Sequence, residues 1–130
     1  MGWTLKILPH RLGIYKLPPT ATVPQELLGT RFISITRCPT EISIVCEEGN
    51  CPGYEIQNNG WRCLKVDASL PLDAIGVLAS ISTALASAGV SIYVVSTYET
   101  DYVLVKDAQL ACAIDCLTEA GHQVYDGSEF

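Results

Sequence analysis

Charged residues are scarce in this chain of 130 residues, and positive ones are the scarcest. Only 17% of the residues are charged, and 8 Lys and Arg stand against 14 Asp and Glu, which gives a formal net charge of −6. The basic residues are scattered singly. Because nucleic acids and anionic membranes are bound through clustered basic side chains, the sequence excludes both as partners.

Side chains suited to catalysis are also few. His10 and His122 are the two histidines, and neither falls in a nucleophile or general-base motif. The sequence contains no glycine-rich loop of the kind that holds phosphates. We therefore expect a non-enzymatic protein with no catalytic residue and no cofactor.

The first nine residues lack a charged segment followed by an apolar one, which is the pattern of a secretory signal. We therefore expect a cytoplasmic protein whose cysteines are reduced. These are Cys38, Cys46, Cys51, Cys63, Cys112 and Cys116. A thiol or zinc protein is a rival hypothesis, because Cys112 and Cys116 would lie on one helix face. The sequence has no Cys-x-x-Cys pair, so we expect no metal site.

Hydrophobic residues, in contrast, are abundant. They make up 48% of the chain, and the mean hydropathy is +0.27, which indicates a large core or an apolar surface reserved for a partner. Residues 74–98 carry no charge and are numerous enough to span a bilayer. However, the run contains seven Ser and Thr, and at Gly89 it changes from Ala- and Leu-rich to β-branched. It predicts a buried helix followed by a buried strand, not a membrane span.

In the second half of the chain, segments with the residue pattern of strands alternate with segments that have the apolar spacing of helices. Strands are predicted at 61–66, 90–97, 102–105 and 122–125, from alternating or β-branched residues. Apolar residues at helical spacing predict a helix from Ile75 to Leu85, ended by Gly89. A second helix is predicted from an N-cap at Asp107 to Gly121. The order β-α-β-β-α-β is that of the ferredoxin-like fold.

The first half repeats this pattern with less helix. At an offset of 60 residues, several positions carry similar residues: Gly29 and Gly89, Ile35 and Val95, Glu41 and Asp101. Residues 3–7 also resemble residues 61–66. The first helix is reduced to residues 25–28, and a turn-rich loop at 47–53 replaces the second. We predict an α+β fold of two ferredoxin-like (βαββαβ) halves, 1–59 and 60–130, the first with reduced helices, that share one core.

Specific segments then point to a family. They are Gly60-Trp61, Ile75 to Ala79, Leu85 to Ile92, Ser96 to Val105 and, upstream, Glu41 to Cys46. In these the chain resembles the tandem ACT-domain proteins of the CASTOR-like family, which includes the cellular arginine sensor. The resemblance implies two ACT-type halves that are non-catalytic and bind a small amino acid. The arginine sensor carries four ACT units with its ligand between two of them, so a homodimer of this chain would recreate such an interface.

The candidate ligand-binding residues come from two segments: Ala74, Ile75, Gly76 and Val77, and Ser96, Thr97, Tyr98 and Asp101. The first is a helix start, where unpaired N–H groups favour a carboxylate. The resemblance implies that Gly76 lines the ligand and that Asp101, beside Thr97, contacts its cationic group. Two alternatives stay open. Gly76 could pack against a neighbouring strand, and Asp101 could close its own turn by accepting from backbone N–H groups.

Two functional hypotheses follow from the sequence. The first is an amino-acid-binding regulatory protein whose ligand site combines the helix start with the acidic hairpin turn. The second is a ligand-free dimerisation or protein-interaction module, in which the surplus apolar surface serves a partner. The first predicts a homodimer, and the second predicts a homodimer or a complex with a partner protein.

Overall fold

The computed structural model describes residues 2–50, 56–67 and 75–127. The chain divides into two compact units. We call residues 1–9 and 62–129 the C-terminal unit, and residues 10–61 the N-terminal unit. This division differs from the predicted halves mainly in residues 1–9, which belong to the C-terminal unit, and also in residues 60 and 61, which belong to the N-terminal unit.

The C-terminal unit has the ferredoxin-like order of elements that the sequence predicts. Its described strands pair in the order β6-β7-β5-β1-β8. They are β1 (Thr4–Ile7), β5 (Ile56–Val66, of which residues 62–66 lie here), β6 (Tyr93–Ser96), β7 (Asp101–Lys106) and β8 (Gln123–Asp126). Helix α1 (Val77–Ser87) joins β5 to β6, and η2 (Asp107–Gln109) and α2 (Leu110–Glu119) join β7 to β8. The predicted α+β, ferredoxin-like fold is confirmed.

Strand β1 explains why the first residues belong to this unit. It pairs antiparallel with β5, for example Leu5 with Val66, and parallel with β8. It thus fills the place between the first and last strands of the β-α-β-β-α-β pattern. The alternation in residues 3–7 correctly indicates a strand, but its partners are distant in sequence and could not be predicted from it.

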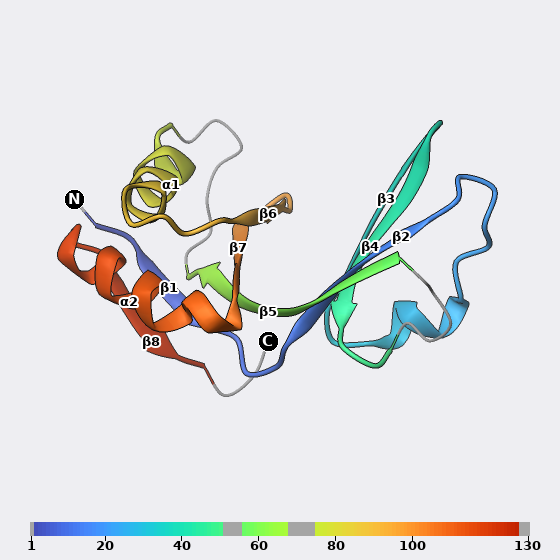
Figure 1. Cartoon of the computed structure of the whole chain (residues 1–130), viewed down its shortest axis with the longest axis horizontal. Coiled ribbons are helices and arrows are strands. Elements are labelled where there is room, and N and C mark those ends of the chain that lie inside the picture. Colours follow the sequence, from blue (N-terminus) through green and yellow to red (C-terminus); the bar gives the residue numbers. More distant parts are fainter. Residues whose placement is uncertain (1, 51–55, 68–74, 128–130) are drawn as a thin grey trace. The chain divides into compact units, whose positions relative to one another are not determined.

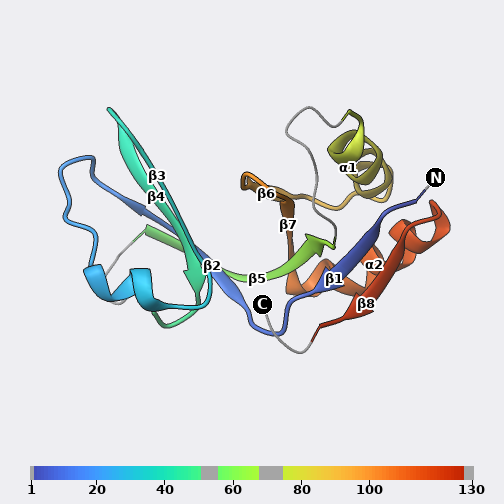
Figure 2. The same ribbon diagram turned by 180° about the vertical axis from the view of Figure 1, so that it is seen from behind.

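Both helices of the C-terminal unit cover one face of its sheet (Figure 1, and from behind in Figure 2). Helix α1 contributes apolar residues at helical spacing, and α2 contributes Ala113 and Leu117. They pack on strand residues that alternate along β1, β5 and β7: Leu5, Ile7, Leu64, Val66, Val103 and Val105. No helix within the described ranges is long and apolar enough to cross a membrane. The uncharged run contains α1 and β6, as predicted, but β6 is half-buried to exposed and not the buried strand that the sequence predicted.

Helix α1 ends at the glycine that the sequence indicates. Gly89 has φ +75°, and its N–H donates to Ala86 O at 3.0 Å, while the N–H of Val90 donates to Leu85 O at 3.0 Å. These two bonds form a Schellman motif, which favours glycine because other residues are strained in the left-handed region.

The predicted N-cap of the second helix is wrong. Asp107 begins the short 3-10 helix η2, and α2 starts three residues later, after Gln109, with no side-chain cap. The Asp107 carboxylate instead forms an ion pair with Arg62 on β5, at 3.4 Å. The Asp107 carboxylate therefore binds a residue that is distant in sequence, and not the backbone N–H groups at a helix start, as the sequence predicted.

In the N-terminal unit, the strands are ordered β3-β4-β2-β5. They are β2 (Leu12–Leu17), β3 (Ile33–Cys38), β4 (Glu41–Glu47) and residues 56–61 of β5, and all neighbours are antiparallel. This is the order of a ferredoxin-like sheet. The 3-10 helix η1 (Gln25–Gly29) stands where the first helix would be, as the sequence predicts. The first strand of this unit is β2, not the residues 3–7 that resemble residues 61–66.

Each unit has a cluster of buried hydrophobic residues of its own. In the N-terminal unit, Tyr15, Leu17, Ile42 and Ile44 pack with Leu27 of η1. Ala21 and Val23 of the preceding segment pack against this cluster. The short helix and its flanking chain thus supply enough apolar side chains for a core of their own.

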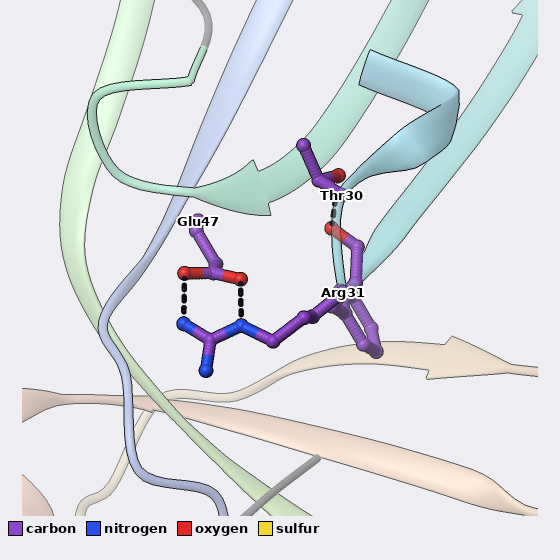
Figure 3. A network of polar contacts seen from close by, with 4 residues as sticks. Thr30, Arg31 and Glu47 are labelled. Atoms are coloured by element: carbon purple, nitrogen blue, oxygen red, sulfur yellow. Dashed lines mark hydrogen bonds and ion pairs between the residues drawn. The ribbon is translucent and has the colours of Figure 1, made fainter. Parts of the chain in front are cut away.

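The segment between η1 and β3 is bonded to β4 through polar side chains (Figure 3). The Arg31 guanidinium donates to both carboxylate oxygens of Glu47, from Nε at 3.0 Å and from Nη2 at 2.9 Å. The Thr30 hydroxyl donates to Leu27 O at 2.7 Å. Because a bidentate pair fixes the orientation of both side chains, it holds the chain between η1 and β3 in place.

Candidate functional site

The candidate residues belong to two segments of the C-terminal unit, the start of α1 and the turn between β6 and β7. Strand β5 ends at Val66, β6 ends at Ser96 and β7 begins at Asp101. Thr100, just before β7, donates its hydroxyl hydrogen to Val66 O at 2.6 Å, so the β6–β7 turn lies against the end of β5. Helix α1 follows β5 and leads to β6. In a split β-α-β unit such a helix starts at the edge where the preceding strand ends.

The turn between β6 and β7 is closed by its two threonines. The N–H of Thr97 donates to Thr100 O at 2.9 Å, and the Thr97 hydroxyl donates to the same oxygen at 3.2 Å. The N–H of Thr100 donates back to Thr97 Oγ1 at 3.3 Å. Thr97 is therefore engaged within the turn. Tyr98, at the tip, is 78% exposed.

Asp101 is held by a side chain, not by the backbone of its own turn. The Ser96 hydroxyl donates to Asp101 Oδ1 at 2.6 Å across the first pair of the β6–β7 ladder. In the described part of the chain this is the side chain's one hydrogen bond. The alternative that Asp101 closes its turn by accepting from backbone N–H groups is thus not what the structure shows, because Thr97 and Thr100 do so. A partly exposed carboxylate with one protein donor has acceptor capacity left for a ligand.

The start of α1 is backbone without a capping side chain. Gly76 is the N-cap residue, with φ 81° and ψ 1°, and no side chain caps the helix. Since the first N–H groups of a helix have no intrahelical acceptor, those of Val77, Leu78 and Ala79 favour a negative group. No acidic residue stands in the first turn. Ile75, just before Gly76, is 94% exposed, whereas Val77 is buried in the core.

Gly76 is not a site of close packing. A Cβ built on it would meet no heavy atom of the described structure within 4 Å. The alternative that it packs against a neighbouring strand therefore finds no support in the structure. Its positive φ accounts for the glycine instead, because residues with a Cβ rarely adopt it. Ala74, the remaining candidate, lies outside the described residues.

Sequence reasoning missed Thr100. This side chain is 8% exposed, and its hydroxyl is the contact that attaches the turn to β5. Its neighbours Glu99 and Asp101 suggest a solvent-exposed turn. A threonine between two acidic residues, just before an apolar strand, was the one available signal.

We predict that Thr100→Val lowers the free energy of unfolding by about 1–3 kcal/mol, because the buried Val66 carbonyl loses its donor. Thr100→Ser keeps the hydroxyl and is expected to lose much less. Urea unfolding of both variants, followed by circular dichroism, measures the difference. If serine were as damaging as valine, the methyl group and not the hydrogen bond would be the stabilising feature.

His122 and the cysteines Cys63 and Cys116 are buried or half-buried in the C-terminal unit. His122 is buried and accepts at Nδ1 from the Trp3 N–H at 2.9 Å. Cys63 is fully buried, and desolvation raises the pKa of its thiol well above the ordinary value. Cys112 and Cys116 lie on α2 as expected, and burial raises the pKa of Cys116. Within the described ranges, no group of three His, Cys, Asp or Glu could hold a metal.

The N-terminal unit has a counterpart of the Asp101 position. Glu41 begins β4, as Asp101 begins β7, and accepts a hydrogen bond from the Ser43 hydroxyl at 2.8 Å. Here the donor comes from the same strand, two residues on, and not from the strand across the turn. The two carboxylates therefore have different surroundings, although the sequence offset pairs them.

Comparison with known proteins gives two family matches. Residues 57–119 match the family model described as ACT domain. Residues 10–54 match a second model, described as an N-terminal domain. The two ranges together include most of the described strands and helices.

The chain is similar to three known proteins over different shares of its length. The crystal structure of a protein from Agrobacterium tumefaciens is 33% identical, with a TM-score of 0.90, and the alignment covers 99% of this chain and 96% of that one. The cytosolic arginine sensor for mTORC1 subunit 1 of Rattus norvegicus is 36% identical over 58 residues, which are 44% of this chain and 18% of that protein. The ligand-free regulatory subunit of aspartate kinase from Thermus thermophilus is 16% identical, with a TM-score of 0.60 over 88% of this chain and 94% of that one. This last likeness concerns the fold alone.

Proposed function

Since residues 57–119 match the ACT-domain family model, we propose that this chain is a non-catalytic regulatory protein that binds a small amino-acid-like ligand. The observation that supports the proposal is the Thr100–Val66 hydrogen bond, which holds the acidic turn against the end of β5, the strand that α1 follows. The proposed ligand residues are Ala74, Ile75, Gly76 and Val77, with Ser96, Thr97, Tyr98 and Asp101 opposite them. The rat relative is named as a cytosolic arginine sensor, and we extend to this chain only a cytosolic, amino-acid-binding role.

In the proposed complex, the ligand's carboxylate lies at the first turn of α1. The uncapped N–H groups there act as donors, and the helix dipole favours a negative charge. Because Gly76 carries no side chain and is exposed, a ligand can reach this backbone closely. A carboxylate at this place would take the role that a capping side chain has in other helices.

A cationic group of the ligand, either its ammonium or its side chain, is proposed to bind Asp101. The Ser96 hydroxyl fixes the carboxylate through one oxygen and leaves acceptor sites on the other. Tyr98, exposed at the tip of the same turn, would cover the ligand's apolar part. Charges of opposite sign at the two ends of the site match the zwitterionic backbone of an amino acid.

A thermal-shift screen against the twenty amino acids tests the proposal. One of them at a concentration of ~100 times its dissociation constant would stabilise the folded protein by about 2.7 kcal/mol. We expect a shift for one amino acid or a few with related side chains. If none of the twenty stabilises the protein at millimolar concentration, the proposed amino-acid-binding role is wrong.

A second candidate function is an interaction module without a ligand. It is favoured by large hydrophobic side chains that remain exposed: Leu28, Ile35, Ile75, Tyr98 and Tyr125. Under either function we propose a homodimer, and we propose that the two units arose by tandem duplication of one ACT-like sequence. A protein that dimerises, but that no amino acid stabilises, would support this second function.

A further inference from the structure

Helices α1 and α2 cover one face of the sheet in the C-terminal unit, and the opposite face carries most of the lysines of the chain. On β1, Lys6 lies between the core residues Leu5 and Ile7, so its side chain points to this opposite face. Lys65 on β5 and Lys106 on β7 lie on the same face by the same alternation. Three of the four lysines are therefore gathered on one side of one sheet, although they are scattered in the sequence.

Two of these lysines are directly opposite each other on neighbouring strands. Lys6 pairs with Lys65 in the β1–β5 ladder, so their Cβ atoms are about 4.5–5.5 Å apart. Among the described residues, no carboxylate forms an ion pair with either ammonium group. Because like charges in such a pair repel each other, the pair destabilises the sheet. A negatively charged partner placed over both lysines would remove this cost.

A tyrosine lies on each side of the lysine pair. Lys65 Nζ stands over the ring of Tyr102 on β7, 5.9 Å from its centroid, and Tyr125 on β8 is paired with Lys6. We call Tyr102, Lys65, Lys6 and Tyr125 the lysine row, which crosses four neighbouring strands. Tyr125 is 41% exposed and the other three side chains are half-buried. Tyrosine combines an apolar ring with a polar tip, so it is well suited to a protein interface.

The side chains of the lysine row are held in place by their surroundings. A Cβ built on Gly127 would lie 2.6 Å from Cγ and from Cδ of Lys6, so the chain at Gly127 lies against the stem of this lysine. The Tyr125 hydroxyl donates to the carboxylate of Asp67, which follows β5. Asp67 is thereby engaged by a tyrosine and leaves the lysines without a counter-charge. Side chains that are already ordered lose less entropy when a partner binds.

We propose that the lysine row binds an acidic segment of another protein, with carboxylates on Lys6 and Lys65 and apolar stems on Tyr102 and Tyr125. The row is about 14 Å wide across its four strands, which suits a peptide of several residues. Small-molecule sites, in contrast, are concave. Nucleic acids and anionic membranes present many more charges than this row can neutralise, and the net charge of −6 repels them. A non-catalytic regulator needs a surface through which it acts, and the lysine row supplies one.

Fluorescence anisotropy with a fluorescein-labelled octaglutamate peptide tests the proposal on the full chain. At low ionic strength, where exposed charges are least screened, the wild-type protein is expected to bind this probe and not an octaglutamine peptide. Lys6→Glu and Lys65→Glu are each expected to raise the dissociation constant about tenfold or more. The matched control is Lys16→Glu, the same change of charge at an exposed position of β2, which should bind like the wild type. A wild-type protein that does not bind octaglutamate, or equal losses in Lys16→Glu and Lys6→Glu, would overturn the proposal.

Unfolding in urea separates the loss of binding from a loss of structure. Lys6→Glu places a carboxylate opposite Lys65, and an opposite-charge pair stabilises a sheet where two lysines repel each other. The variant is therefore expected to unfold at a urea concentration no lower than that of the wild type, although it no longer binds the probe. A lower midpoint would show that Lys6 stabilises the sheet as it stands, and would contradict its role as an unpaired charge kept for a partner.

Two further probes distinguish an acidic protein segment from other polyanions. Labelled octathymidylate and vesicles that contain phosphatidylserine are both expected to bind more weakly than octaglutamate. Stronger binding of either would refute the assignment to a protein partner. Since these measurements need no amino-acid ligand, their failure would be distinguishable from a failure of the proposed amino-acid site.

Discussion

Asp101→Asn is expected to remove most of the thermal stabilisation that an amino-acid ligand gives this protein. Asparagine keeps an oxygen that can accept from the Ser96 hydroxyl, so the turn should keep its structure. The change removes the negative charge, and a hydrogen bond to a charged group contributes about 1.5–3 kcal/mol. If the affinity falls about 100-fold, a ligand at ~100 times the original dissociation constant would stabilise the variant by only about 0.4 kcal/mol, down from about 2.7 kcal/mol.

The chain supplies a matched control for this experiment. Glu41 begins β4 as Asp101 begins β7, and it too accepts from a serine hydroxyl, that of Ser43. Glu41→Gln is therefore the same chemical change at the corresponding place of the other unit, and it should leave the ligand-induced shift as it is. Equal losses in both variants would point to a general charge effect. An unchanged shift in Asp101→Asn would remove Asp101 from the proposed site.

Ile81→Ala is expected to cause the largest loss of stability among simple substitutions in α1. Ile81 is fully buried and packs in the cluster formed by both helices and the sheet of the C-terminal unit. Truncation of a buried isoleucine removes transfer free energy and leaves a cavity, which together cost about 2–5 kcal/mol. Denaturant unfolding followed by circular dichroism measures this loss directly.

The control for Ile81→Ala is Ile75→Ala, two residues before the same helix and 94% exposed. Because an exposed side chain contributes little to folding, we expect a change within about 0.5 kcal/mol in the absence of ligand. The same variant should weaken binding in the thermal-shift screen if Ile75 contacts the ligand. A large loss of stability in Ile75→Ala would contradict the exposed position of this side chain.

Local sequence was a good guide wherever local physics decides the structure. The spacing of apolar residues predicted α1 and α2, because a helix that packs on one side repeats every 3.6 residues. Gly89 was correctly placed at a helix end, where its positive φ is required. The proline-rich first half correctly indicated a reduced helix, and η1 is the one helix among the described residues there.

Long-range pairing was where sequence reasoning failed. The alternation in residues 3–7 fits a strand in either half, and only its ladders with β5 and β8 assign it to the C-terminal unit. Asp107 was predicted to be a helix N-cap, because local sequence does not reveal that its carboxylate pairs with Arg62, which is 45 residues away. The reduced half was expected to be unable to cover its own sheet, yet Leu27 and residues of the chain before η1 pack on that sheet.

For the candidate site, the sequence alone determined the chemical groups: an acidic hairpin turn rich in hydroxyls, and a glycine at a helix start. Residue identities fix charge and hydrogen-bonding capacity, which are properties of each side chain by itself. Only the tertiary structure decided that the hairpin turn lies against the end of β5, through the Thr100–Val66 hydrogen bond, and that β3 forms an edge of the described sheet. Both depend on contacts between segments far apart in the sequence, and no local pattern encodes their partners.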